Sequence, residues 1–453
     1  MAIVAPFRGI TYNFRELGED PSKIVAPPYD VISEQEQEEC YRRHPYNVIR
    51  LILGKRKVGD SDWDNRYTRA ADAFERWKSE DVLIQSDEPS MYLVCTTFDP
   101  GDGDGPRQRW GLIALVRIED KDSGVIIPHE RTFSAHREDR LKLLRACNAQ
   151  FSQIFGLFED PEDTVLSLTR DYAGVPPDIS FDFWDGTTHK MWTLKDPFPF
   201  REVGDLMLSK SILIADGHHR YETALNFRNM MRARYGTRPP NRSYEYVMMY
   251  LANMDGPGLT ILPSHRLITR CAGFQLSDFL EKVDQWFEIK PMLLERLGSA
   301  NEYKHIQVLL DQEGRTSSAL GFYCSDDSKF YLLTLRHGAR EEMGDDLHPS
   351  LKKLDVLVLS RLILQKTLGF NKEDLDDEEI FHYQSDMKKA LSLVESGAYQ
   401  MAFVLNPTKI SHVKDVTSNF LIMPRKSTFF YPKVLTGLVF NSIDPHEIIQ
   451  IPS

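Results

Sequence analysis

The sequence predicts a mixed α/β (α+β) protein built from more than one packed unit. Short apolar runs bounded by Gly, Pro or Asp alternate along the chain with longer amphipathic stretches. With 42% hydrophobic and 27% charged residues, the composition is that of a folded protein. A chain of 453 residues exceeds the size at which a single core stops growing. We therefore expect two regions, residues 1–275 and a C-terminal α/β region, residues 276–453.

The elements of the first half follow from periodicity and turn signals. Ser33 before the acidic run 34–39 predicts a capped helix, and residues 67–78 and 137–149 have helical patterns. Apolar runs around Gly/Asp-rich turns predict strands. The strands expected are residues 48–53, 91–97, 110–118, 124–127, 180–184 and 189–194.

The second half begins with a strand at residues 211–215 that leads into a helix at 221–235. Strands at 247–252 and 259–262 follow, and beyond about residue 275 the pattern changes to helix–strand units. Near the end we expect a helix at 351–368, a strand at 401–405 and a loop at 424–437.

Charge and cysteine content narrow the class of protein. A net charge of −12 argues against a nucleic-acid partner, which requires a basic surface. The five scattered cysteines form no CxxC pair, as is typical of reduced thiols in the cytoplasm. There is neither a leader-like segment nor an apolar run of membrane-spanning length. We expect a cytoplasmic protein without a membrane partner; the oligomeric state stays open.

The segment 216–220, Asp-Gly-His-His-Arg, joins an apolar strand to a helix. Backbone N–H groups at a helix N-terminus attract anions, and Gly217 permits close approach. His218, His219 and Arg220 add donors suited to phosphate oxygens. The sequence therefore predicts a phosphate-binding loop.

Asp216 stands at the end of that strand, where a carboxylate can hold Mg²⁺ or accept a hydroxyl proton. The alternative is that Asp216 only caps the helix and the histidines cover a turn. A zinc site is disfavoured, because adjacent histidines diverge and no His-x-x-x-His pair follows.

Further polar residues are candidates for the same site. Glu130 is a candidate general base and His129 a phosphate or substrate contact, although Arg131 can pair with Glu130 in a plain surface contact. Asp30 follows two prolines on a rigid corner, with Asn47 and Arg50 close behind it along the chain. A simple turn before a helix explains Asp30 equally well.

Two later clusters carry cations. His265 and Arg266 follow a predicted strand and are candidate substrate contacts. Residues 423–433 combine cations with hydroxyls and aromatic rings, which suggests an anion site in an acidic chain. A strand with a basic outer face is the alternative. The phosphate-binding candidates there are Lys426, Ser427, Thr428 and Lys433.

Five segments in order, 26–32, 128–130, 215–224, 262–266 and 423–433, resemble the bacterial and archaeal family called domain of unknown function 1015. The loop 216–220 is also similar to that of free-serine kinases in the ParB/sulfiredoxin superfamily. This resemblance implies a ParB/sulfiredoxin-like phosphate-binding core with an additional α/β C-terminal region. The chain has neither a Walker A motif nor Gly-x-Gly-x-x-Gly, and His218 replaces the sulfiredoxin cysteine, so sulfiredoxin chemistry is not expected.

The function expected from these residues and this resemblance is a phosphotransferase with Mg²⁺ as its cofactor. It would reversibly phosphorylate L-serine to O-phosphoserine, using pyrophosphate or a nucleotide as donor. His218, His219 and Arg220 would stabilise the transferred group, Lys433 and Lys426 the rest of the donor, and Asp216 or Glu130 would accept the proton. A phosphatase or hydrolase, and a non-catalytic nucleotide or phosphate sensor, are the alternatives.

Overall fold

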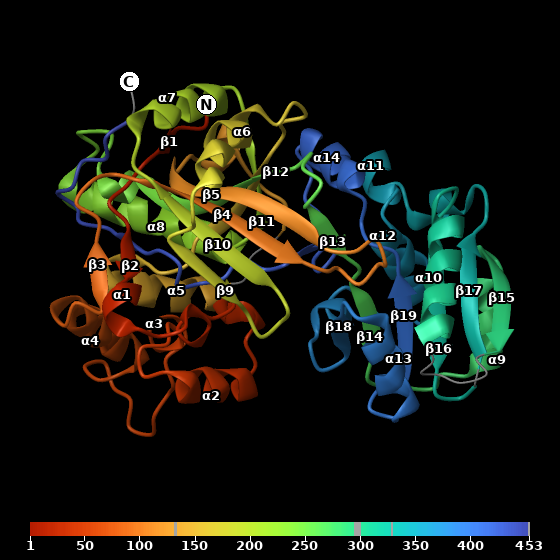
Figure 1. Ribbon diagram of the computed structural model, residues 1–453. Helices are drawn as coiled ribbons and strands as arrows, with labels where there is room; N and C mark the ends of the chain where they lie inside the picture. Colours follow the sequence, from red (N-terminus) through yellow and green to blue (C-terminus); the bar gives the residue numbers. More distant parts are fainter. Residues whose placement is uncertain (131–133, 294–299, 328, 452–453) are drawn as a thin grey trace. The chain divides into compact units, whose positions relative to one another are not determined.

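The computed structural model describes residues 1–130, 134–293, 300–327 and 329–451 (Figure 1). The chain forms two compact units, Met1–Thr260 with Phe430–Ser453, and Ile261–Phe429. The mixed α/β class is confirmed. The expected division at residue 275 differs from this one, because the last segment returns to the first unit. That return depends on pairings such as Asn441 with Gln150, which local sequence does not reveal.

In the described part of the first unit, nine strands form a mixed sheet in the order β6-β11-β8-β12-β5-β4-β10-β9, with β1 pairing to β5. β6 and β11 run parallel, so their carboxyl ends lie at the same edge of the sheet. The strands are β1 (Val4–Ala5), β4 (Met91–Phe98), β5 (Arg107–Arg117), β6 (Ile126–Pro128), β8 (Ile154–Phe158), β9 (Ile179–Asp182), β10 (Thr188–Leu194), β11 (Ile212–Asp216) and β12 (Tyr246–Asn253).

Helix α8 packs against this sheet through Tyr221, Ala224 and Leu225. Its other contacts include Phe227 and Met231, which cluster with Leu144 of α5. The helices of the unit are α1 (Phe14–Leu17), α2 (Glu34–Arg43), α3 (Ile49–Ile52), α4 (Arg66–Ser79), α5 (Ser134–Cys147), α6 (Thr164–Arg170), α7 (Pro197–Leu208) and α8 (His218–Tyr235). The short strands are β2 (Ile10–Tyr12), β3 (Leu83–Gln85), β7 (Ala149–Gln150) and β21 (Asn441–Ser442), with β13 (Thr260–Leu262) and β20 (Phe429–Tyr431) at the two junctions between units.

Local signals explain where two of these helices begin. Ser33 caps α2 as expected: its side chain accepts from Glu36 N–H, and the Glu36 carboxylate accepts from Ser33 N–H in return. The strand expected at 48–53 is wrong, because α3 occupies that run. An apolar run alone does not distinguish a strand from a buried helix, and the Asn47 side chain accepts from Ile49 N–H at the helix start.

The second unit is built on an antiparallel sheet, and its described strands have the order β15-β17-β16-β19-β14-β18. One face packs on α10 and α13 through Leu310 and Leu391. On the other face Phe322 and Phe403 contact Phe279 of α9. The strands are β14 (His265–Ile268), β15 (Phe287–Leu293), β16 (Ala319–Cys324), β17 (Lys329–Leu335), β18 (Phe381–Gln384) and β19 (Met401–Leu405).

The helices of this unit are α9 (Leu276–Val283), α10 (Ala300–Gly314), α11 (Pro349–Lys352), α12 (Asp355–Val358), α13 (Met387–Glu395) and α14 (Ile410–Ser418). The single helix expected at 351–368 is wrong. The chain instead forms α11, α12 and a π-helical stretch, Leu359–Thr367, because it leaves helical geometry at Leu354.

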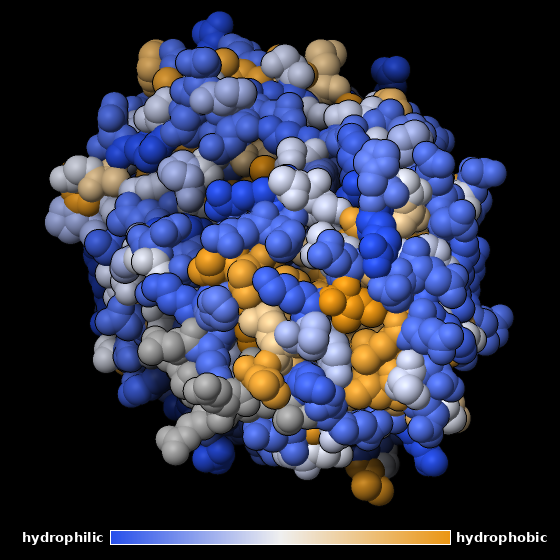
Figure 2. Space-filling model, turned by 90° about the vertical axis from the view of Figure 1, so that its right-hand side faces the viewer, coloured by the Kyte–Doolittle hydropathy of each residue, from blue (hydrophilic) through white to orange (hydrophobic). Residues whose placement is uncertain are grey.

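Two surface properties agree with the composition. On the face shown in Figure 2, hydrophilic side chains predominate and hydrophobic ones gather in a few patches. Within the described ranges, no helix combines the length and the apolar character needed to cross a membrane.

Candidate functional site

The turn from β11 into α8 is the centre of the candidate site. Asp216 ends the strand, Gly217 follows at φ +94°, and His218 begins the helix. No side chain caps this helix, and the Tyr221 N–H donates to the Gly217 carbonyl. The N–H groups of the first turn therefore have no acceptor within the helix, and the positive end of its dipole lies at Gly217.

Asp216 joins two cations at this turn. Its Oδ1 accepts from Lys433 Nζ at 2.7 Å and its Oδ2 from Arg220 Nη2 at 2.5 Å. Burial alone would raise the pKa of Asp216, but Lys433 and Arg220 outweigh burial and hold it well below its usual range. The carboxylate is thus ionised and fixes two positive charges beside an uncapped helix N-terminus.

Further residues hold these cations in place. Arg220 also donates to the Gln153 carbonyl, and its Nε is buried with no partner among the described residues. Arg109 donates to the carbonyl of Pro432 at 2.6 Å, directly before Lys433. Arg109 is itself buried against the Phe155 ring, at 4.7 Å. Arg109 could not be singled out from the sequence, because it lies within a strand, β5, and belongs to none of the polar clusters at strand ends.

His218 and His129 are buried inside the protein. His129 N–H donates to His218 Nε2 at 3.2 Å, and the two rings lie 4.6 Å apart. The His129 Nδ1 contacts the carbonyl of Ile214. Burial lowers the pKa of His129 to about 4 and that of His218 well below its usual value. Both rings are therefore neutral at pH 7 and make contacts within the protein, and their phosphate and substrate contacts stay a prediction.

The neighbours of these histidines stay closer to the surface. His219, the second residue of α8, is half-buried, and so is Glu130, which follows His129 beyond β6. Because β6 and β11 are parallel, Glu130 and Asp216 leave the sheet at the same edge. The structure thus brings the segments 128–130, 216–220 and 433 together.

The N-terminal candidates have other roles. Asn47 is fully buried and donates to the carbonyls of Lys23 and Val25, which corrects the expectation of a substrate contact. Arg50 donates to the Tyr41 carbonyl and lies over that ring, so it too has a structural role. Asp30 is exposed.

Five candidates belong to the second unit and are described there. His265 is buried, and its Nδ1 accepts from Leu405 N–H, whereas Arg266 donates to the carbonyls of Ser264 and Lys426. Ser427 is buried and donates to the Pro424 carbonyl. These three side chains bond to backbone groups of their own unit, and their ligand contacts stay a prediction. Lys426 is exposed and Thr428 half-buried.

The residues present do not fit a preformed Mg²⁺ site. Both Asp216 oxygens are paired with cations. In the part of the chain that the structure describes, no group of three or more His, Cys, Asp or Glu side chains is arranged to hold a metal ion. Asp216 is an ion-pair partner of Lys433 and Arg220 in the structure, and its role as a Mg²⁺ ligand stays a prediction.

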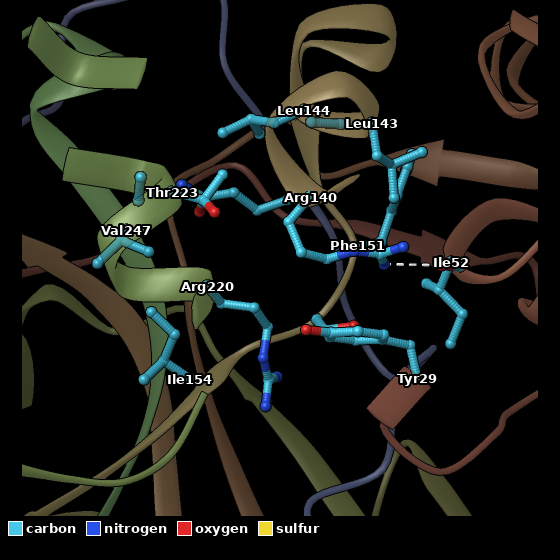
Figure 3. Close-up of a pocket in the computed structure, with 14 residues that line it drawn as sticks. Tyr29, Ile52, Arg140, Leu143, Leu144, Phe151, Ile154, Arg220, Thr223 and Val247 are labelled. Carbon is cyan, nitrogen blue, oxygen red and sulfur yellow. Dashed lines mark hydrogen bonds between the residues drawn. The ribbon is translucent and has the colours of Figure 1, made fainter. Parts of the chain in front are cut away.

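A small pocket adjoins the loop, as Figure 3 shows (volume about 60 Å³). Arg220 of α8 and Tyr29 extend toward one another across it. Arg140 lies over the Tyr29 ring at 4.0 Å and donates to the Ile52 carbonyl. Burial, with Asp30 nearby, raises the pKa of Tyr29 to about 12. Arg140 does not stand out in the sequence, because it is one of several charged residues in α5.

Comparison with known proteins identifies the family. Residues 4–357 match the model of the family described as protein of unknown function (DUF1015). The chain belongs to this family. The matched range of this DUF1015 chain contains Asp216 and Arg220, whereas Lys433 lies beyond it. No curated protein matches the chain.

Three solved structures with a similar fold show only low sequence identity to this DUF1015 protein. A free serine kinase in complex with AMP is 10% identical, with a TM-score of 0.34 over 70% of this chain and 87% of the other. A conserved hypothetical protein from Pyrococcus furiosus has 10% identity and a TM-score of 0.32, over 70% and 90%. C-terminally truncated SbnI from Staphylococcus aureus has 10% identity and a TM-score of 0.32, over 72% and 85%. Similarity at this level assigns no activity to the chain.

Proposed function

We propose that this protein is a phosphotransferase that moves a phosphoryl group to the hydroxyl of a small metabolite. L-Serine is the proposed acceptor, and pyrophosphate or a nucleotide the donor. The observation that carries the proposal is the uncapped N-terminus of α8 beside Lys433 and Arg220, two cations that Asp216 holds in place.

This arrangement suits a phosphoryl group. The N-terminal N–H groups and the helix dipole favour an anion. The two positive charges of Lys433 and Arg220 also exceed the single negative charge of Asp216. Because Asp216 fixes Lys433 and Arg220 before any ligand arrives, they need little reorganisation as charge develops on the transferred group.

The pocket beside Arg220 supports a small acceptor. A buried water needs about 10–15 Å³ measured in the same way, so a volume of about 60 Å³ corresponds to a few waters. This is the scale of a small metabolite such as serine. Arg220 lines the pocket and also belongs to the loop, so it would contact both the acceptor and the transferred group.

The chemical step needs a base for the acceptor hydroxyl. Asp216 is a poor choice, because both of its oxygens are engaged and its pKa is depressed. We assign the role to Glu130, at the same edge of the sheet. The hydroxyl oxygen bonds to phosphorus as the bond to the donor's bridging oxygen breaks. The proton passes to Glu130, and the donor leaves as orthophosphate or as the shortened nucleotide.

A phosphate-binding sensor without turnover is the second candidate. It is favoured by the internal contacts of Asp216, His218 and His129, which leave fewer groups for chemistry than the sequence suggested.

Phosphorus NMR of the purified protein decides between them. O-Phosphoserine is supplied with orthophosphate, AMP or ADP, with and without Mg²⁺. Pyrophosphate, ADP or ATP appearing in the respective tube establishes a reversible kinase and names its donor. Orthophosphate released from O-phosphoserine in every tube shows a phosphatase, and binding without conversion supports the sensor.

Two variants connect the activity to the site. Arg220→Ala should abolish conversion, and Glu130→Gln should slow it by about 10²- to 10⁴-fold while phosphate still binds. Glu88→Gln, at an exposed position, is the matched control. Full activity in both site variants would remove the loop from the mechanism.

A further inference from the structure

A second cavity, of about 300 Å³, lies wholly within the second unit. Its walls come from four places in the chain: the turn after α10, Arg340, the start of α12 around Asp355, and the segment that leads into α14. From the last of these, Thr408, Lys409 and His412 line the cavity. Its volume is at the lower end of the range of small-molecule sites in proteins.

The lining of this cavity is positively charged, although the whole chain carries −12. Arg315, Arg340, Lys353 and Lys409 face a single carboxylate, Asp355. A concave surface lined by one sign of charge concentrates ions of the opposite sign. The electrostatics therefore favour an anionic ligand.

Two of these cations already have carboxylate partners outside the lining. Lys353 pairs with Asp415 at 2.7 Å, and Arg315 with Asp311 at 2.7 Å. In the described ranges no ion pair is recorded for the other two, Arg340 and Lys409. These two are the cations that remain for a ligand.

The polar atoms of Arg340 indicate unused binding capacity. Its Nη2 donates to Ser318 Oγ at 2.9 Å, while its Nε is buried and has no partner in the described part of the chain. Burial raises the pKa of the Asp355 carboxyl, while Ser318, Arg340 and Lys409 act in the opposite direction. Arg340 therefore has hydrogen-bonding capacity that the described part of the chain does not use.

Helix α14 adds a second source of donors at the same place. Its N-terminus has no side-chain cap, and Lys409 is the residue directly before it. Lys409 Nζ donates to the Gly314 carbonyl, which holds its ammonium group at the rim between two walls of the cavity. Burial and Lys409 lower the pKa of His412, so its ring is neutral at pH 7.

We propose that this cavity binds the phosphate group of a small organic phosphate, held by Arg340, Lys409 and the N-terminus of α14. Phosphate matches the site better than a single carboxylate does, because two cations and a helix N-terminus suit a dianion. The site is separate from the loop at Asp216, so the proposal stands whether or not that loop transfers phosphate.

Equilibrium dialysis of the full chain tests the proposal, with labelled AMP and inorganic phosphate as probes at low ionic strength. We expect Lys409→Glu to remove one bound phosphate per chain, or to weaken it by about tenfold or more. A carboxylate at a helix N-terminus stabilises the helix, so this variant keeps its fold. Arg340→Gln is a second, independent variant.

Lys388→Glu is the matched control, because it makes the same charge change at an exposed position on α13 outside the cavity. Binding unchanged in both cavity variants overturns the proposal, and so does equal loss in the Lys388 control. Citrate bound as tightly as the phosphate probes overturns the assignment to phosphate. Bound phosphate that is lost only in Arg220→Ala belongs to the loop at Asp216 and is subtracted before the cavity variants are compared.

Discussion

Lys433 donates a hydrogen bond to Asp216 across 217 residues of chain, and the Nζ–Oδ1 distance is 2.7 Å. The contact places a cation from the returning C-terminal segment beside the first turn of α8. Arg109, through the Pro432 carbonyl, holds the backbone directly before Lys433.

Replacing Lys433 by Met should destabilise the first unit by about 3 kcal/mol, because Asp216 loses one of two cations in a mostly buried setting. Urea unfolding measures the change, and phosphate binding at the loop should weaken in parallel. Lys190→Met, on the exposed side of β10, should leave both quantities unchanged. Equal stability of the two variants would show that the ion pair contributes nothing.

Gly217→Ala should disturb the loop in two ways. At φ +94° an alanine costs about 1–2 kcal/mol, and its Cβ would lie 2.9 Å from Arg220 Nε. Gly18→Ala is a matched control at φ +60°, where an added Cβ has nothing within 4 Å. We expect both variants to lose stability, whereas only Gly217→Ala loses phosphate binding. Retained binding in Gly217→Ala would contradict the Arg220 contact.

Stability should fall as the pH drops from about 6.5 towards 4. Burial holds the pKa of His129 at about 4 and that of His265 at about 3, whereas both titrate near 6.5 when unfolded. In this window the unfolded chain binds more protons than the folded one. Each such histidine therefore lowers the free energy of unfolding by about 1.4 kcal/mol for every pH unit that the pH falls. Above pH 6.5 both states are neutral and the effect disappears.

Urea midpoints from pH 7.5 to 4.5 measure this slope. His129→Asn should reduce it, and His446→Gln, an exposed position, should not. A midpoint that stays constant across the range would show that these rings take up protons without unfolding.

Filling the pocket beside Arg220 should separate acceptor binding from donor binding. Thr223 lines the pocket and is buried, so Thr223→Leu reduces the space for an acceptor. We expect KM for serine to rise by about tenfold, with donor KM unchanged. Thr223→Val, nearly equal in volume, is the control. A rise in donor KM alone would place the acceptor elsewhere.

Local features of the sequence predicted local features of the structure. The strand-to-helix loop at 216–220 and the Ser33 cap both depend on residues within a few positions of one another. The sequence suggests that Lys433 lies near the phosphate, but it does not predict the ion pair between Lys433 and Asp216. An ion pair between residues 217 positions apart leaves no local pattern in the sequence.

The internal contacts of His129, His218 and Asn47 could not be predicted from the sequence, for a related reason. A polar residue in a sequence looks the same whether it faces a ligand or satisfies buried backbone groups. Asn47 does the latter, with bonds to Lys23, Val25 and Ile49, and His129 contacts the Ile214 carbonyl. Only the packing of the whole unit decides between these roles.

The discontinuous first unit has a consequence for biosynthesis. A ribosome adds about 5–20 residues per second, so Lys433 emerges roughly 10–45 seconds after Asp216. During that interval the nascent chain has β11 and α8 but lacks the cation that completes the cluster, while the entire second unit is translated. Completion of the loop is therefore a late event in chain synthesis, and truncated chains released before residue 433 would carry an unfinished site.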